Sequence, residues 1–116
     1  GEKYGVLALG DLGAAGQTRL MRNAGGALSE LAHSPLLLKV AHHGSADQSS
    51  QLFELLSADV AIFSVGQNPY GHPTKKALDQ ATLNGAIVVR TDELGSVAFR
   101  FEGQSWKISS AGKLTA

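Results

Sequence analysis

The segment LLLKVAHHGS, residues 36–45, decides the fold of this chain. Its apolar run follows Pro35 and predicts a buried strand over residues 36–41. Two histidines, a glycine and a serine come directly after that strand. In an open α/β sheet, ligands bind at the edge where the strands end. The segment therefore predicts both a central strand and a functional edge of the sheet.

Strand-like and helix-like patterns alternate on either side of this segment. Strands are expected over residues 4–9, 59–65 and 86–90, and helices over residues 17–23, 50–56 and 73–83. Gly25-Gly26 is expected to interrupt or end the first helix, because glycine costs about 1 kcal/mol relative to alanine in a helix, and residues 27–32 form either a second helical turn or a continuation. Ser49 or Ser50 caps the second helix, and Pro73 suits the first turn of the third. Residues 66–71 are expected to form a loop and residues 91–95 a turn.

The last part of the chain has a different pattern. Residues 97–101 and 105–109 each alternate apolar and polar side chains, and a short Gly-containing link between them predicts a β-hairpin. The predicted order is β-α-β-α-β-α-β plus a terminal β-hairpin, which indicates an α/β fold with a sheet that is parallel through its first part. The 116 residues suffice for one small domain and not for two.

Composition excludes several classes of function. Ten basic residues balance ten acidic ones, so no net charge attracts the chain to nucleic acid. The chain has no cysteine, which excludes disulfides, thiolate zinc sites and a cysteine nucleophile. No apolar run approaches the ~20 residues that a membrane-spanning helix needs.

The candidate functional residues follow the predicted strands. Asp11 ends the segment LALGD, His42 and His43 follow the central strand, and His72 lies in the segment YGHP. Imidazole and carboxylate together suit zinc, manganese or iron. Because neighbouring residues on a strand point to opposite faces, one histidine of the pair is expected to face the site while the other packs or hydrogen-bonds behind it.

Each of these residues also has a structural explanation. Asp11 can cap a helix, the histidine pair can form a solvated turn, and His72 can close its loop. Lys39 interrupts an apolar strand and serves either a phosphate or DNA contact or a salt bridge. The glycines at 10, 13 and 16 lack the G-x-G start of a dinucleotide-binding loop. A flavodoxin-like phosphate-binding domain would leave HHGS and YGHP unexplained.

Five motifs together carry a family resemblance: LALGD (7–11), LLKVAHHGS (37–45), VAIFSVG (60–66), YGHP (70–73) and RTDxxG (90–95). Their order and spacing resemble the carboxy-terminal half of a metallo-β-lactamase-type αββα sandwich, and in particular the carboxy-terminal domain of ComEC-type competence proteins, which take up DNA. The resemblance covers almost the whole chain. It implies one partial domain over residues 1–116.

The resemblance also implies roles for individual residues. Asp11 matches an aspartate that bridges two metal ions, Zn or Mn, in the complete domain. His43 is the better match to the family's last ligand histidine, and His42 remains possible. His72 is similar to a residue beside the active site that contacts substrate or assists protonation of the leaving group. The expected substrate contacts are Lys39, Ser45 and Tyr70.

One departure from the family pattern limits these expectations. The chain contains no H-x-H-x-D-H motif, on which the family builds most of its metal site. The first half of the domain is therefore expected to precede Gly1, and this part alone is expected to bind metal weakly and not to catalyse. We also expect it to self-associate through the sheet that the missing half would cover.

The resemblance implies a metal-dependent phosphodiesterase or nuclease-like activity for the complete domain, acting on single- or double-stranded DNA. The domain would be a soluble part of a bacterial membrane protein, on its extracytoplasmic face, beside the membrane channel domain of the same polypeptide. Two alternatives stay open. One is another metallo-β-lactamase-type hydrolase, similar to phosphorylcholine esterases, and the other is a non-catalytic module that binds DNA or a protein partner.

Overall fold

The structure of the chain is a computed structural model, which describes residues 3–66 and 68–110. The expected α/β order is confirmed, with a parallel sheet followed by a hairpin. The elements in chain order are β1 (Gly5–Ala8), α1 (Ala14–Ala32), β2 (Leu36–Lys39), the 3₁₀ turn η1 (Ala41–Gly44), α2 (Ser50–Leu56), β3 (Val60–Phe63), α3 (Lys75–Leu83), β4 (Ile87–Arg90), α4 (Thr91–Leu94), β5 (Val97–Glu102) and β6 (Ser105–Ser110).

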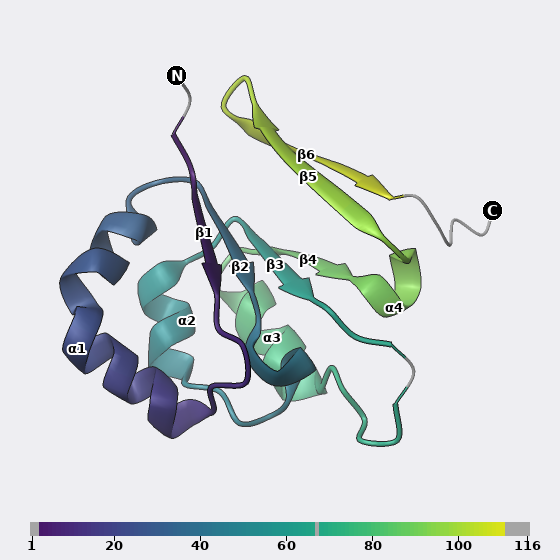
Figure 1. Cartoon of the computed structure of the whole chain (residues 1–116), viewed down its shortest axis with the longest axis horizontal. Helices are drawn as coiled ribbons and strands as arrows, with labels where there is room; N and C mark the ends of the chain where they lie inside the picture. The colour runs from purple at the N-terminus through teal and green to yellow at the C-terminus, as the bar shows by residue number, and fades with distance from the viewer. Residues whose placement is uncertain (1–2, 67, 111–116) are drawn as a thin grey trace.

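The first four strands form one parallel sheet in the order β1-β2-β3-β4. A helix connects each strand to the next, and α1, α2 and α3 cover the same face of the sheet (Figure 1). This arrangement follows from the right-handed crossover that parallel βαβ units adopt. The carboxyl ends of all four strands therefore lie along the same side of the sheet, which we call its carboxyl edge. The segments that follow the strands meet there.

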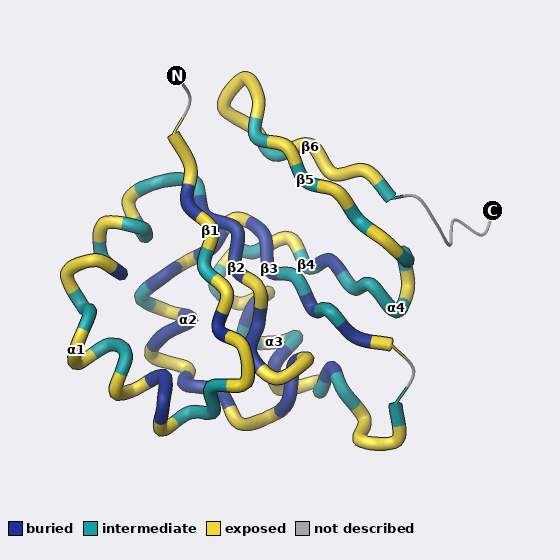
Figure 2. The backbone as a smooth tube through the Cα atoms, in the orientation of Figure 1, coloured by how far each residue is buried: buried dark blue, intermediate teal, exposed yellow. Residues whose placement is uncertain are grey.

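The main core lies between the sheet and the three helices, where Figure 2 shows the most deeply buried backbone. Strand residues at every second position point into it, as the pleat of a strand requires. Its fully or nearly fully buried side chains include Leu36, Leu38, Ala61 and Phe63 from the strands, and Leu28, Leu52, Leu56 and Ala77 from the helices. Burying large aliphatic and aromatic side chains stabilises the fold by roughly 1.5–3 kcal/mol each.

The hairpin β5–β6 covers part of the opposite face. Its side chains Val97, Phe99 and Trp106 pack against Leu37, Val60 and Val89 of the sheet. Val6 and Ile87 share this face, because they pair in register with Leu37 and Val60. Their side chains nevertheless remain 56% and 60% exposed. The hairpin therefore leaves apolar surface uncovered along both outer strands.

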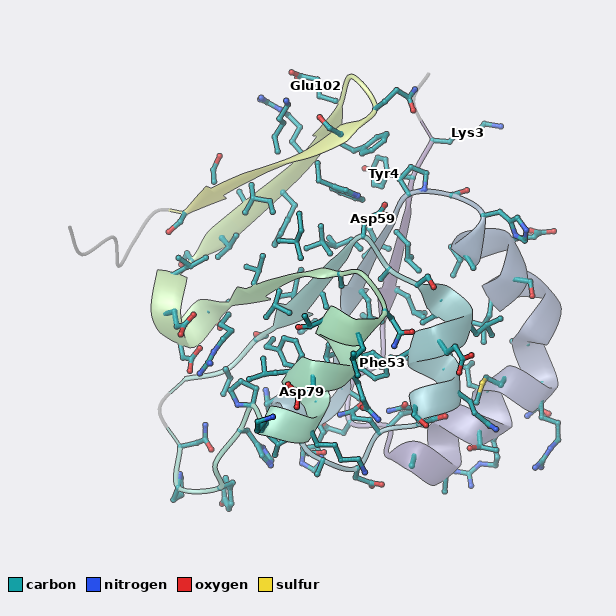
Figure 3. All side chains as sticks on the ribbon, turned by 180° about the vertical axis from the view of Figure 1, so that it is seen from behind. Lys3, Tyr4, Phe53, Asp59, Asp79 and Glu102 are labelled. Atoms are coloured by element: carbon teal, nitrogen blue, oxygen red, sulfur yellow. The ribbon has the colours of Figure 1, made fainter. Side chains whose placement is uncertain are left out.

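The amino end of the sheet carries an aromatic cluster. The ring of Tyr4 lies 5.8 Å from that of Phe101 and 5.4 Å from that of Trp106. Figure 3 shows Tyr4 beside the hairpin, with Asp59 close by. The indole of Trp106 donates a hydrogen bond to the Asp59 carboxylate at 3.4 Å. These contacts fix the hairpin at the end of the sheet opposite the edge where the strands end.

Four local predictions need correction. Helix α1 begins at Ala14, earlier than expected, and runs to Ala32, and the expected interruption near Gly25-Gly26 takes the form of a kink at Ala24. The central strand ends at Lys39, and residues 41–44 turn away from the sheet. Residues 91–94 form the short helix α4 instead of a simple turn.

The fourth correction concerns the start of α3, where Pro73 lies before the helix. Thr74 is the N-cap, and its hydroxyl accepts a hydrogen bond from the Ala77 amide at 3.2 Å. A threonine cap satisfies a free amide of the first turn, which a proline at that place cannot do. The expected loop over residues 66–71 includes Gln67, which lies outside the described residues.

Candidate functional site at the carboxyl edge of the sheet

Backbone hydrogen bonds bring three of the sequence motifs together at the carboxyl edge. The His42 amide donates to the Gly10 carbonyl at 2.7 Å, which joins the HHGS turn to the segment containing Asp11. The Thr74 amide and hydroxyl both donate to the Gly44 carbonyl, at 2.8 and 3.0 Å. The YGHP segment is thereby fixed against the same turn.

The turn η1 presents both histidines to solvent. His42 and His43 adopt left-handed backbone conformations, with φ of 49° and 54°, and both side chains are exposed. Left-handed residues other than glycine are uncommon and cluster at functional sites. The expectation that the two histidines point to opposite faces of a strand is wrong, because neither lies on a strand.

Gly44 allows this turn to pack closely against the sheet. Its φ is +85°, and a Cβ placed there would lie 2.6 Å from the Phe63 ring and 2.7 Å from the Pro73 Cβ. Both neighbours are buried. The glycine therefore meets two demands at once, a left-handed backbone and the close approach of two buried side chains.

Three imidazole rings and one phenol ring gather above this turn. The ring centroid of His42 lies 5.7 Å from that of His72 and 6.4 Å from that of His43, and the Tyr70 ring lies 5.9 Å from His72. These four side chains line a cavity of about 500 Å³. The structure thus brings together His42, His43 and His72, which the sequence places as far as 30 positions apart.

The hydrogen bond of His43 defines which of its two ring nitrogens is free to bind a metal ion. His43 Nδ1 lies 2.7 Å from the carbonyl oxygen of Ser64, the residue after β3. Because a carbonyl oxygen only accepts, Nδ1 carries the proton, and in the neutral ring Nε2 keeps its lone pair. Histidines that bind metals commonly donate their second ring N–H to a carbonyl in this way. The geometry therefore favours His43 over His42 as a ligand.

Asn68 holds the loop that carries Tyr70 and His72. Its side-chain oxygen accepts from the amides of Tyr70 and His72, both at 3.1 Å. Its side-chain nitrogen donates to the carbonyls of Gly66 and His72, both at 2.9 Å. This residue was not predicted from the sequence, although the Asn-Pro dipeptide at 68–69 is a turn signal. One amide side chain thus sets the shape of the loop.

An acidic side chain, Asp92, shares a second cavity with His72. This cavity, of about 610 Å³, is lined by Gly66, Asn68, Pro69, His72 and Asp92. Asp92 accepts hydrogen bonds from Arg90 at 2.8 and 3.1 Å. These bonds raise the pKa of the Arg90 guanidinium, against a smaller opposing effect of burial. His72 therefore lines two cavities, one with aromatic rings in its lining and one with a carboxylate.

Two buried glutamines connect the turn to the helices behind it. Gln17 in α1 is fully buried, and Gln48 is 5% exposed. Gln17 Nε2 donates to the Gln48 side-chain oxygen at 2.9 Å, and its oxygen accepts from the Ser49 amide at 2.8 Å. Gln48 in turn donates to the carbonyls of Ala41 and Ser45, at 2.9 and 3.0 Å. Neither glutamine was singled out from the sequence, because their contact spans 31 positions.

The remaining candidate residues have separate surroundings. Asp11 is exposed in the turn after β1. Lys39 is exposed at the end of β2, in register with Ala8 and Ile62 on the face opposite the helices. Ser45 is buried, and its hydroxyl accepts a hydrogen bond from the Asp47 amide at 3.2 Å. Ser45 therefore shapes the end of the turn.

The described residues alone do not complete a metal site. Within residues 3–66 and 68–110, no group of three His, Asp or Glu side chains is arranged to hold a metal ion. Zinc takes about four ligands, of which a catalytic site leaves one open.

Fold and site together define the class: an α/β domain with a parallel sheet and a cluster of histidines at its carboxyl edge. Over 70 residues the chain is 36% identical to ComE operon protein 3 of Bacillus subtilis (strain 168). The match covers 59% of this chain and only 9% of that relative, so the chain spans a small part of the relative's length. No protein-family model matches the chain. No solved structure matches it either.

The helices provide one further observation about the setting of the site. In the part of the chain that the structure describes, none of them combines the length and apolar character that crossing a membrane requires.

The close packing of Gly44 predicts that replacing it with alanine lowers stability more than the same replacement of Gly71 does. We expect Gly44→Ala to lower the free energy of unfolding by about 2–5 kcal/mol, from the left-handed backbone and from overpacking against Phe63 and Pro73. Gly71 also has a positive φ, +76°, but within the described residues no atom other than those of its two chain neighbours lies within 4 Å of the place that a Cβ would occupy there. Gly71→Ala should therefore cost only about 1–2 kcal/mol. Urea denaturation measures both, and equal losses would contradict the packing argument.

The buried amide network predicts a second matched pair. Gln48→Leu removes one of the two hydrogen bonds that Gln17 Nε2 donates and takes the Gln48 donor from the carbonyls of Ala41 and Ser45, so we expect a loss of about 2–5 kcal/mol in unfolding free energy. Gln51 is exposed on α2, and Gln51→Leu should change the stability by less than about 0.5 kcal/mol. Thermal and urea denaturation test this. A Gln48 variant as stable as the Gln51 variant would show that the network does not hold the turn.

Proposed function

We propose that this chain is part of the metal-dependent phosphodiesterase domain of a DNA-uptake protein. The observation that carries the proposal is the cluster of His42, His43 and His72 at the carboxyl edge of a parallel sheet. The similarity to ComE operon protein 3 supports it, as do the five motifs that resemble ComEC-type proteins. Two metal ions, when bound in the complete domain, would activate water and stabilise the oxygens of a phosphodiester.

The proposed roles follow the surroundings of each residue. His43 contributes Nε2 as a ligand, because its Nδ1–H is committed to Ser64. His42 is the alternative ligand, and Asp11 approaches the same edge through the Gly10–His42 hydrogen bond. His72 contacts substrate or assists protonation of the leaving group, from its position between two hollows.

The substrate contacts of the proposal are Lys39 and Tyr70, whereas Ser45, which was also expected to contact substrate, is buried and shapes the end of the turn. Tyr70 and Lys39 are exposed, so their side chains are accessible to a polyanion. The equal numbers of basic and acidic residues give this chain no attractive net field for DNA. Most of the phosphate contacts would therefore come from other parts of the same protein.

The remaining ligands of the proposed site would come from an H-x-H-x-D-H segment elsewhere in the protein. Two observations support a missing layer: the apolar side chains of Val6 and Ile87 are exposed, and β1 pairs only with β2 among the described residues. An uncovered sheet edge of this kind also pairs readily with other chains. In isolation, the chain would therefore self-associate through this surface.

The proposed setting is a bacterial membrane. The domain would lie on the extracytoplasmic face, next to the channel domain of the same polypeptide, where single- or double-stranded DNA arrives.

Calorimetric titration with Zn²⁺ and Mn²⁺ tests the proposal. We expect this chain to bind either ion weakly, and a longer protein with an H-x-H-x-D-H segment ahead of it to bind tightly. In the longer protein, His43→Ala should weaken binding by about tenfold or more. His33→Ala is the matched control and should have no effect, since that histidine lies on the surface at the end of α1.

Two outcomes would contradict the proposal. Tight binding by this chain alone would mean that its own histidines and Asp11 form a self-sufficient site. Weak binding by the longer protein as well would remove the metal from the proposed function and leave a non-catalytic module.

A further inference from the structure

The hollow above the η1 turn has walls of aromatic rings. His42, His43, Tyr70 and His72 line its volume of about 500 Å³. A smaller adjoining hollow of about 200 Å³ is lined by His43, Val65, Gly66, Asn68, Tyr70 and His72. Neither lining contains an acidic side chain. Such walls suit a planar, neutral ring that packs face to face or edge to face.

Tyr70 is the most accessible of these rings. Its side chain is 76% exposed. This exposure is unusual, because tyrosine rings in folded proteins usually bury a large apolar area. One side of the ring rests on His72 at 5.9 Å, with the two planes inclined by 35°. The arrangement leaves most of the phenol ring accessible to a ligand.

The loop that carries Tyr70 is ordered before any ligand arrives. Asn68 accepts hydrogen bonds from the amides of both Tyr70 and His72, and it donates to the carbonyls of Gly66 and His72. The Thr74 bonds to Gly44 fix the far end of the loop to the histidine turn. A platform held in this way loses little conformational entropy when a ligand stacks on it.

We propose that Tyr70 is a stacking platform for an unpaired nucleobase, with the three histidines beside it. This inference rests on the proposed function, since it takes DNA as the ligand, and it narrows that ligand to a single strand. Stacking on an aromatic side chain needs a free base face, which a single strand offers and an intact duplex covers. Stacking also requires no net charge, in agreement with the neutral composition of the chain.

The test measures binding without any metal. A fluorescein-labelled single-stranded oligothymidine is titrated with the protein in EDTA, and fluorescence anisotropy gives the Kd. Tyr70→Ala should raise the Kd by about tenfold, the effect of removing one stacking ring. Tyr70→Phe keeps the ring and should leave the Kd unchanged. Because Tyr70 is exposed, neither variant disturbs the core.

Two controls separate stacking from general attraction. Tyr4→Leu removes an exposed tyrosine ring, 53% accessible, from the opposite end of the sheet and should leave the Kd unchanged. An oligonucleotide of the same length without bases keeps every phosphate. It should bind the unaltered protein as weakly as oligothymidine binds the Tyr70→Ala variant.

Three results would overturn the inference: no binding of oligothymidine by the unaltered protein, equal binding of the strand without bases, or an unchanged Kd for Tyr70→Ala. Equal or tighter binding of a duplex would also contradict it. Because no metal is present, these results differ from those that test the proposed function. If the single strand stacks on Tyr70 but no metal binds, only the proposed phosphodiesterase function is rejected. If metal binds but the strand does not stack, only the proposed stacking platform is rejected.

Discussion

The hydrogen bonds that Gln17 and Gln48 make with each other and with the backbone around them are the interactions on which the rest of the site depends. They lie where water cannot replace them, so each lost bond leaves a buried group without a partner. Gln17 anchors α1 to the cap of α2 through the Ser49 amide, and Gln48 holds the carbonyls at both ends of the histidine turn. The strained conformations of His42 and His43 are therefore maintained by residues behind the turn, and the rings remain free for a ligand.

Parallel topology explains why so many functional candidates meet in one place. Each strand of the sheet ends at the same edge, so the segments with Asp11, the histidine pair, His72 and Asp92 all emerge there. The interactions differ along this edge. A carbonyl orients His43, an amide side chain orients the loop of Tyr70 and His72, and Arg90 pairs with Asp92. The outcome is one hollow lined by rings next to a second one with a carboxylate.

Periodicity and turn residues predicted the elements well, because those signals are local. The order of strands and helices, the parallel sheet, the Ser49 cap and the terminal hairpin all follow from neighbouring residues. The errors arose where distant contacts decide. The histidines leave the strand because Gly44 fits between Phe63 and Pro73. Of the site, the histidines and Tyr70 were found from motifs. Gln17, Gln48 and Asn68 were missed, because the structural role of an amide side chain depends on hydrogen-bond partners that only the fold brings near.

We propose that His43 binds a metal ion at the carboxyl edge of the sheet, with His42 and His72 close beside it. Paramagnetic broadening of the imidazole NMR signals by substoichiometric Mn²⁺ tests it most directly, because broadening reports distance to the ion even when binding is weak. We expect selective broadening of those three histidines, with the signal of His33, which lies at the end of α1, unaffected. Equal broadening of all four histidines, or of His33 alone, would contradict it.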